Sequence, residues 1–481
     1  MLKDTRWDRD LSVTAEADGL TGHAGAVLLR KLADQCGLTA AHGPALARAG
    51  KFPLIDRGVA LVPVAVAIVL GATSMRDIAL LDHQELVFGA PPSDTTVRRT
   101  LDLADARVLG KIAKARAKAR AKVRAHVWGL IAATAAGFPW LTIAGKTLAG
   151  WLVIDMDATL ITAHSDKEGA APTFKKGFGF HPLGAWLSNT RESLAMLLRP
   201  GNAGSNTVSD HIEVLAAALA QIPPRWRSKL LVRIDGAGAS HDLVKHLLSL
   251  STPRRTVLFT CGWMITGADE QAIRTLPADA WTAAVDQDGT VQKNTAVAEI
   301  THISSRAAGW PAGLRWIVRR TKPSRRQMKN LTAFEKATGW RYSIIVTNIP
   351  ATGIKDVPGT HHPQFIDVLH REHAVVEDRV RTNKALGLRN LPSKTWPVNC
   401  GWVLAANIAA DLDAWCRLLG LHDQADLKDA EPDTLRFRLW HLPARLTRHA
   451  RKRVLKISRA WPWKEAFLTC WQRLCALPAP S

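Results

Sequence analysis

Three acidic residues in this chain have the side chains and the settings that metal-dependent chemistry needs. Asp157 is set into the apolar segment WLVIDMDATLITAHS, Asp235 ends the apolar run KLLVRID, and Glu377 lies in the helical pattern VLHREHAVVEDRVRTNK. Two aspartates on neighbouring strands and a glutamate on a helix supply the hard oxygen ligands that Mg²⁺ prefers. Two such ions, about 3.5–4 Å apart, can activate a water or a 3′-hydroxyl and stabilise the departing oxygen of a phosphodiester. These residues therefore predict a Mg²⁺ site for phosphodiester chemistry.

The charge of the chain favours a polyanionic partner. Its 481 residues include 64 Lys and Arg against 42 Asp and Glu, a formal net charge of +22. An excess this large favours nucleic acid as the macromolecular partner. A membrane is disfavoured, because the longest apolar run, Val59–Ala72, is shorter than the roughly 20 residues of a spanning helix and contains Pro63.

Nothing in the sequence points to secretion, to zinc or to a disulfide framework. The N-terminus, MLKDTRWDRD, lacks the charged-then-apolar pattern of a signal peptide, so a bacterial cytoplasmic protein is expected. The six cysteines are scattered without CxxC spacing and are expected to be reduced. The HREH segment contains His370 and His373, but it matches neither HExxH nor HxxEH.

The elements that must position the acidic residues can be read from the hydrophobic patterns. Residues 1–148 show helical patterns, whereas from Trp151 short apolar strands alternate with helices, which is typical of an α/β core. Short alternating runs between turn signals predict a β-rich insertion over 254–350. A long helix is expected from about Pro363 to Leu386, ending at Gly387. In this helix His370, His373, Glu377 and Lys384 fall within an arc of roughly 60°, as in a helix that lines a site.

One N-terminal helix could follow phosphates. The segment KIAKARAKARAKVR contains basic residues and no acidic one, and its interleaved alanines favour helix. Two rows at i, i+4 spacing are the candidate contacts: Lys114, Lys118 and Lys122, and Arg116 with Arg120. The alternative is an ordinary solvated charged helix.

With these motifs the chain resembles the DDE transposases of insertion sequences. Asp157 in DMDAT, Asp235 in LLVRIDGAGAS and Glu377 in VVEDRVRTNK look like the D, D and E of that family. The chain is most similar to the group in which a β-rich insertion precedes a Y-x₂-R-x₃-E-x₆-K signature. Within that group it resembles the insertion sequence 1380 family, through ITAHSDKEGAAPTFKKGFGFHPL and VVEDRVRTNKALGLRNLPS.

The resemblance implies a fold and a division into domains. It implies an α/β, ribonuclease H-like catalytic core interrupted by a β-rich insertion, with a helical N-terminal DNA-binding domain and a basic helical C-terminal region. The expected boundaries are 1–148 for the N-terminal domain, 149–253 and 351–400 for the two parts of the core, 254–350 for the insertion and 401–481 for the C-terminal region.

The resemblance also implies roles for individual residues. Asp157, Asp235 and Glu377 would hold Mg²⁺, for which Mn²⁺ can substitute, and Lys384 would contact a phosphate of DNA. The signature departs at two positions, where His370 replaces the tyrosine and His373 the arginine. Both histidines are candidate DNA contacts. Three further basic residues are candidates as well: Arg371 beside the signature, and Lys175 and Lys176 in FKKGFGFHP, for which an exposed loop pair is the alternative.

The implied reaction is cleavage at the terminal inverted repeats of an element, followed by joining of the 3′-hydroxyls to target DNA. It needs two ends together, so a homodimer on DNA is expected by analogy. A metal-dependent nuclease without strand transfer and a non-catalytic DNA-binding protein derived from a transposase are the alternatives.

Two further hypotheses concern residues near these motifs. Asp155 shares a sheet face with Asp157 by strand alternation, and is expected to pair with a nearby Lys or Arg and to support the site. One tryptophan of the 254–350 region is a candidate to stack on an extruded base, against the alternative of core packing.

Overall fold

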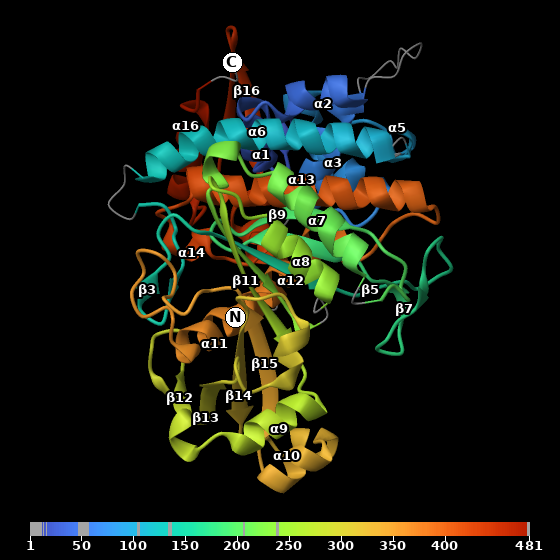
Figure 1. The fold of residues 1–481 in the computed structure, drawn as a ribbon. Coiled ribbons are helices and arrows are strands. Elements are labelled where there is room, and N and C mark those ends of the chain that lie inside the picture. The colour runs from blue at the N-terminus through green and yellow to red at the C-terminus, as the bar shows by residue number, and fades with distance from the viewer. Residues whose placement is uncertain are drawn as a thin grey trace.

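The chain folds around one large mixed sheet with helices stacked above it (Figure 1). The structure is a computed structural model that describes residues 12, 14–15, 17–46, 57–102, 106–132, 137–204, 207–236 and 240–478. In Figure 1 the helices α6 and α13 cross the molecule side by side above the sheet, and strands β12 to β15 extend to the opposite end.

The N-terminal segment is helical, as the sequence predicts. The helices are α1 (Ala26–Gln35), α2 (Leu38–Leu46), α3 (Arg57–Leu70), α4 (Glu85–Phe88), α5 (Asp94–Leu101) and α6 (Ala106–Ala132), with a 3₁₀ segment η1 (Met75–Gln84). Helix α3 is apolar over nearly its whole length and contacts α13, so it is a core helix. No single described helix has the length and hydropathy to cross a membrane, although Ala60–Leu70 and Met75–Phe88, bent by 89°, pass the same test as a pair.

The central sheet has nine strands in the order β12-β13-β14-β15-β11-β10-β4-β8-β9. Strands β4, β10 and β11 are parallel, and their other neighbours are antiparallel. The bounds on the β4 side are β4 (Leu152–Ala158), β8 (Leu183–Leu187), β9 (Glu192–Leu197), β10 (Lys229–Ile234) and β11 (Thr256–Trp263). Helices α7 (Val208–Ala220) and α8 (His241–Ser249) follow β9 and β10 in the chain.

Residues 254–350 are rich in strands, but these strands continue the central sheet. They are β11 together with β12 (Thr282–Val285), β13 (Val291–Glu299), β14 (Arg315–Thr321) and β15 (Arg341–Thr347), with α9 (Gly267–Thr275) and α10 (Ala333–Thr338) beside them. Strand β15 pairs antiparallel with β11, which joins the two parts of the sheet.

Two of the three small sheets outside the central one, among the described residues, lie close to β4 in the chain. Strands β2 (Thr142–Ile143) and β3 (Lys146–Thr147) form a short hairpin before β4. Strands β5 (Ile161–Thr162), β6 (Ala171–Pro172) and β7 (Phe178–Phe180) form a three-stranded sheet in the order β5-β7-β6.

The expected long helix is present as a helix with changes of pitch. It consists of α11 (Pro363–Arg371), a 3₁₀ turn η7 (Glu372–Val375), α12 (Val376–Asn383) and a π turn η8 (Lys384–Leu388). Gly387 has φ of +98°, and a Cβ there would lie 2.9 Å from the side chain of Ile68, so glycine suits both the turn and the close packing against α3.

The C-terminal region departs from the expectation of a basic region that is helical throughout. The expected boundary at residue 400 falls inside α13 (Trp396–Gly420), a helix with a mostly buried surface. After α14 (Ala425–Lys428), α15 (Pro432–Leu435) and η9 (Arg436–Trp440), the chain forms a hairpin of β16 (Ala444–His449) and β17 (Lys452–Ile457), and it ends with α16 (Lys464–Cys475). Strand β1 (Leu20–Thr21) pairs with β16, so the N-terminal and C-terminal regions are joined.

Candidate active site

Asp157 and Asp235 lie next to each other at the same edge of the sheet. In the parallel pair of β4 and β10, Met156 is opposite Ile234. The next residue on each strand is one of the two aspartates, so their backbones are neighbours across a strand spacing of about 4.8 Å. Asp157 is half-buried and Asp235 is exposed. Residues 237–239 of the glycine turn lie outside the described residues.

Glu377 reaches this pair from the first turn of α12, which packs against β4. The pKa of Asp157 is raised, mainly by burial and further by the nearby charges of Asp235 and Glu377, against the opposing effect of His373. Like charges raise a carboxyl pKa only at short range. The three predicted acidic residues are therefore brought together.

The donor set fits a divalent cation in its chemistry, because three crowded carboxylates need a positive charge between them. The three carboxylates do not have the geometry of metal ligands: within the described ranges, no group of three His, Cys, Asp or Glu side chains is arranged to hold a metal. Instead, the Asp157 and Asp235 carboxylates accept hydrogen bonds from the backbone N–H groups of Ala158 (2.7 Å) and Gly236 (2.6 Å). Side-chain rotation is required before all three can share an ion.

A buried ion pair lies directly beneath the two aspartates. Arg233 Nε donates to Asp155 Oδ1 (2.6 Å) and Arg233 Nη2 donates to Asp155 Oδ2 (2.9 Å). Both side chains are 1% exposed. Ser188 Oγ also donates to Asp155. The expectation that Asp155 pairs with a nearby cation is confirmed, and its partner is Arg233.

His373 joins this buried pair to the helix that carries Glu377. Burial alone would raise the pKa of Asp155, but Arg233 and His373 outweigh it and hold that pKa well below its usual range. The ionised carboxylate can only accept, so His373 Nδ1, 3.0 Å from Asp155 Oδ1, is the donor. His373 Nε2 is buried and has no hydrogen-bond partner among the described residues.

His370 fills a space that Gly262 leaves open on β11. A Cβ at Gly262 would lie 2.6 Å from His370 Nε2 and 3.6 Å from Asp235 Oδ1. His370 Nδ1 is 3.1 Å from Thr260 Oγ1. Burial, with the nearby His373, lowers the pKa of His370 to about 3, so its imidazole is neutral at pH 7. His370 packs beside the site as an uncharged group. The structure contradicts the prediction that His370 and His373 contact DNA, because both face protein partners, Thr260 and Asp155.

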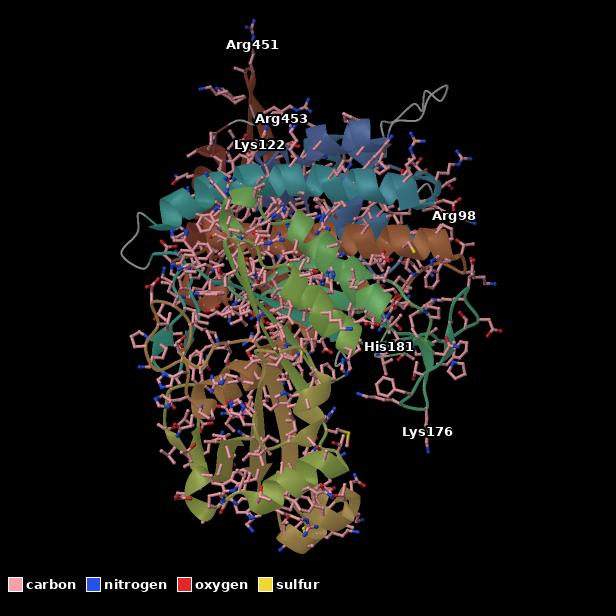
Figure 2. The ribbon with its side chains drawn as sticks, in the orientation of Figure 1. Arg98, Lys122, Lys176, His181, Arg451 and Arg453 are labelled. Carbon is pink, nitrogen blue, oxygen red and sulfur yellow. The ribbon has the colours of Figure 1, made fainter. Side chains whose placement is uncertain are left out.

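The predicted basic contacts divide into two sets. The pKa of half-buried Lys384 is lowered by burial and then by Lys175, so these two lysines lie within electrostatic range of each other. Lys175 and Lys176 are exposed in the turn between β6 and β7, which Figure 2 shows standing out from the core at Lys176. Arg371, in contrast, donates to Asp367 (3.0 Å) and to the Val285 carbonyl, and is held against β12.

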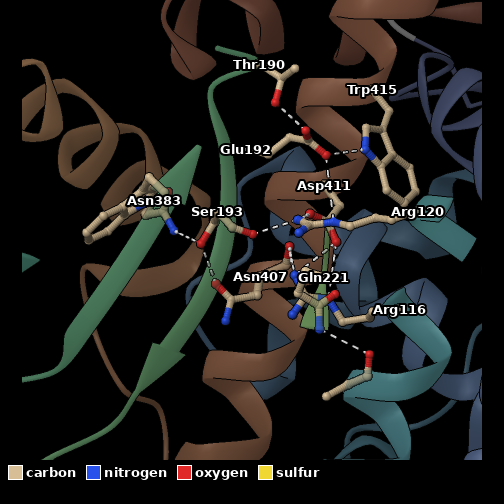
Figure 3. Close-up of polar contacts among 12 residues, drawn as sticks. Arg116, Arg120, Thr190, Glu192, Ser193, Gln221, Asn383, Asn407, Asp411 and Trp415 are labelled. Carbon is tan, nitrogen blue, oxygen red and sulfur yellow. Dashed lines mark hydrogen bonds and ion pairs between the residues drawn. The ribbon is translucent and has the colours of Figure 1, made fainter. Parts of the chain in front are cut away.

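The prediction that Arg116 and Arg120 contact DNA is wrong. Figure 3 shows both side chains pointing into the core from α6 toward Asp411 on α13. Arg116 Nη2 lies 3.0 Å from Asp411, and Arg120 pairs with Asp411 and, at 3.7 Å, with Glu192. Their row of the helix is the buried one, whereas Lys114 and Lys118 are exposed on α6 and Lys122, which Figure 2 labels, is half-buried.

The same buried network reaches the helix of Glu377. Ser193 Oγ donates to Asn407 (2.9 Å), and Asn383 Nδ2 donates to Ser193 Oγ (3.2 Å), as Figure 3 shows. Asn383 is the last residue of α12 and directly precedes Lys384. Polar contacts therefore fix the end of α12 against β9 and α13.

The sequence analysis did not identify Arg233 and Gly262 as residues of the site, although the position of Arg233 in the sequence indicates its role. Arg233 lies two residues before Asp235, as Asp155 lies two before Asp157, so opposite charges occupy matching positions of two apolar strands. Gly262 leaves no comparable signal.

The tryptophans of 254–350 mostly pack against protein. Trp263 and Trp316 are buried, and Trp310 stacks on His241 with ring centroids 3.7 Å apart. Trp281 and Trp340 are half-buried, and the Arg320 guanidinium lies over both rings. Core packing accounts for Trp263 and Trp316, and base stacking stays a hypothesis for the half-buried rings.

A cleft of about 710 Å³ lies on another side of α12. Arg233, Glu372 and Arg379 contribute to its lining, whereas the three carboxylates do not. Its position separates it from the candidate metal site.

Comparison with known proteins identifies a family and a similar solved structure. Residues 5–479 match the family described as "Transposase DDE domain group 1". Among solved structures, the chain is similar to a cryo-EM structure of a piggyBac transposase synaptic complex with hairpin DNA, at 11% sequence identity and a TM-score of 0.41, with 91% of this chain and 82% of that chain covered. No curated protein matches the chain.

Proposed function

Because the chain belongs to the family of transposases with DDE domain group 1, we propose that it moves a DNA element. In this proposal it binds terminal inverted repeats, cleaves at the element ends and joins the freed 3′-hydroxyls to target DNA. The observation that carries the proposal is the convergence of Asp157, Asp235 and Glu377, three acids from distant parts of the chain, beside one another's charges.

The three carboxylates would hold the metal. Bound divalent cations would activate the attacking oxygen and stabilise the departing one. The chain itself keeps the ligands in place: β4 and β10 set the spacing of the aspartates, and the Asp155–Arg233 pair ties these strands together beneath them. His373 donates to the same Asp155 from η7, which fixes the approach of Glu377.

The basic residues around the triad would hold DNA. Lys384 directly follows α12, the helix that carries Glu377, and Lys175 lies within its electrostatic range, so both could contact phosphates of the same DNA. Lys114 and Lys118 on the exposed row of α6 offer a second surface. Binding two ends at once would require a homodimer on DNA.

Two finer assignments belong to the same proposal. The strands β9-β8-β4-β10-β11, three antiparallel and then two parallel, support a ribonuclease H-like core, with β12 to β15 as the inserted part. The signature around Glu377 and Lys384 supports membership of the insertion sequence 1380 family.

The proposal is tested with Asp157→Asn and a duplex that carries the DNA end flanking the gene. We expect the variant to lose Mg²⁺-dependent cleavage and strand joining to background while its affinity for that end stays within about twofold of wild type. Exposed Asp166→Asn serves as the matched control and should cleave normally.

Retained cleavage by Asp157→Asn would remove the central claim. Cleavage by the wild type without joined products would favour a nuclease, and binding without cleavage would favour a non-catalytic DNA-binding protein.

A further inference from the structure

The β16–β17 hairpin carries more positive charge than its own contacts use. Between Ala444 and Ile457 the sequence has no Asp or Glu, and its basic residues are Arg445, Arg448, Arg451, Lys452, Arg453 and Lys456. All six are exposed. Arg445 and Arg453 donate only to backbone carbonyls, those of Asp18 and Val87. In the part of the chain that is described, no carboxylate forms an ion pair with any of the six.

The register of the hairpin places like charges opposite one another. Arg445 faces Lys456 and Arg448 faces Arg453 across the two strands. Like charges in directly opposed positions destabilise a strand pair. A hairpin built this way is stabilised when a polyanion lies along it.

The hairpin also projects from the body of the molecule. Strand β1 pairs only with Ala444 and Arg445 at its base, and within the described ranges no strand other than β17 pairs with β16 beyond Arg445. Figure 2 shows Arg451 and Arg453 on the hairpin that stands out beyond α6, on the side away from the sheet. Four further residues of β16, at about 3.4 Å each, extend roughly 13 Å. The major groove of B-DNA is about 12 Å wide and 8.5 Å deep and admits a two-stranded ribbon.

We propose that the β16–β17 hairpin inserts into the major groove of duplex DNA, with its cations on the flanking phosphates. The proposed function identifies this DNA as that of the mobile element, and the proposal rests on it in this respect. Both faces of the ribbon carry cations, Arg448 and Arg453 on one and Arg445, Lys452 and Lys456 on the other, whereas a ribbon that lies on a membrane needs one apolar face. The major groove of A-form RNA is too narrow for a ribbon, which favours DNA.

The test compares the triple variant Arg448→Ser, Arg451→Ser, Lys452→Ser with a matched triple variant at the other end of the molecule. The matched variant, Lys329→Ser, Lys336→Ser, Lys355→Ser, removes the same charge from exposed positions. Affinity for a mixed-sequence DNA duplex is measured over a series of KCl concentrations. Each lost phosphate contact lowers the slope of log K against log salt by about 0.9. We expect the slope to fall by about 2–3 in the hairpin variant, with affinity at least tenfold weaker, and to change little in the matched one.

Dimethyl sulfate footprinting reports the groove, because guanine N7 lies in the major groove. Wild type should protect N7 and the hairpin variant should not. Arg448→Lys with Arg451→Lys should retain binding, and an unchanged urea midpoint should show that the serine variant is folded. An unchanged slope, an equal loss in the matched variant, N7 left unprotected by wild type, or equal affinity of wild type for double-stranded RNA would each overturn the proposal.

Measuring metal-dependent cleavage distinguishes a failure of this proposal from a failure of the proposed function. At saturating protein the hairpin variant should still cleave, whereas Asp157→Asn should bind with the wild-type salt slope and not cleave. A wild type that never cleaves, but whose slope falls only in the hairpin variant, would contradict the proposed function and support the inserted ribbon.

Discussion

At the scale of single residues, Asp155 and Asp157 are neighbours on one strand with opposite environments. Asp155 is paired with Arg233 and His373, and its pKa is depressed, whereas Asp157 faces two other acids and its pKa is raised. The charge of the Asp155 carboxylate is neutralised by protein partners, whereas the Asp157 carboxylate lies among like charges that a bound cation would neutralise. This difference separates a supporting residue from a proposed metal ligand.

Replacing Asp155 should mainly cost stability. In Asp155→Asn the Arg233 guanidinium stays buried without its counterion, and breaking a buried pair costs about 3–5 kcal/mol. Urea unfolding should show this loss, and residual cleavage should exceed that of Asp157→Asn. The exposed Arg191–Asp429 pair, at 2.5 Å, provides the control, since Asp429→Asn should cost less than about 1 kcal/mol. Equal losses in the two variants would show that the buried pair has no special role.

The raised pKa of Asp157 predicts a pH dependence of metal binding. Metal binds the carboxylate form, and a raised pKa means that protons compete at a higher pH than for an ordinary aspartate. Mn²⁺ affinity, followed by calorimetry, should therefore weaken on acidification starting above the range of a free carboxyl, about 3.9. An affinity that stays constant down to that range would contradict the crowding of the three acids.

At the scale of elements, α6 shows how far the sequence could predict the molecule. Its basic composition predicted a helix and two rows of cations, and both are present. The sequence pattern could not tell which row faces water, because the partners that bury Arg116 and Arg120 come from β9 and α13, far along the chain. The positions of Asp157, Asp235 and Glu377 were predictable because strand ends and a helical stripe are local patterns. The β16–β17 hairpin was missed because its dense basic residues hid the strand alternation.

The two rows of α6 should respond differently to substitution. Asp411→Asn removes the shared partner of Arg116 and Arg120 and should cost about 3–5 kcal/mol of unfolding free energy. Lys114→Ser with Lys118→Ser should leave that free energy nearly unchanged and lower the salt slope of DNA binding by about 2. Urea unfolding and binding titrations on the same two variants measure both effects. A lysine variant that loses stability but not DNA affinity would contradict the exposed-row assignment.

At the scale of the whole molecule, the exposed basic residues are spread over several separate elements. Lys384 directly follows α12 and lies within electrostatic range of Lys175, α6 lies above the sheet, and the β16–β17 hairpin projects beyond α6. We expect the element's DNA to contact these surfaces while one of its ends occupies the proposed metal site. Variants of the basic surfaces should lose DNA binding, and variants of the three acidic residues should lose cleavage but keep DNA binding.

The shared metal site is tested most directly by Mn²⁺ binding to Asp157→Asn, Asp235→Asn and Glu377→Gln, measured by calorimetry without DNA. If the three acids form one site, each single variant should weaken Mn²⁺ binding at least tenfold, and a double variant should lose little more than either single one. Wild-type affinity in any of the three, or losses that add independently, would contradict a shared site.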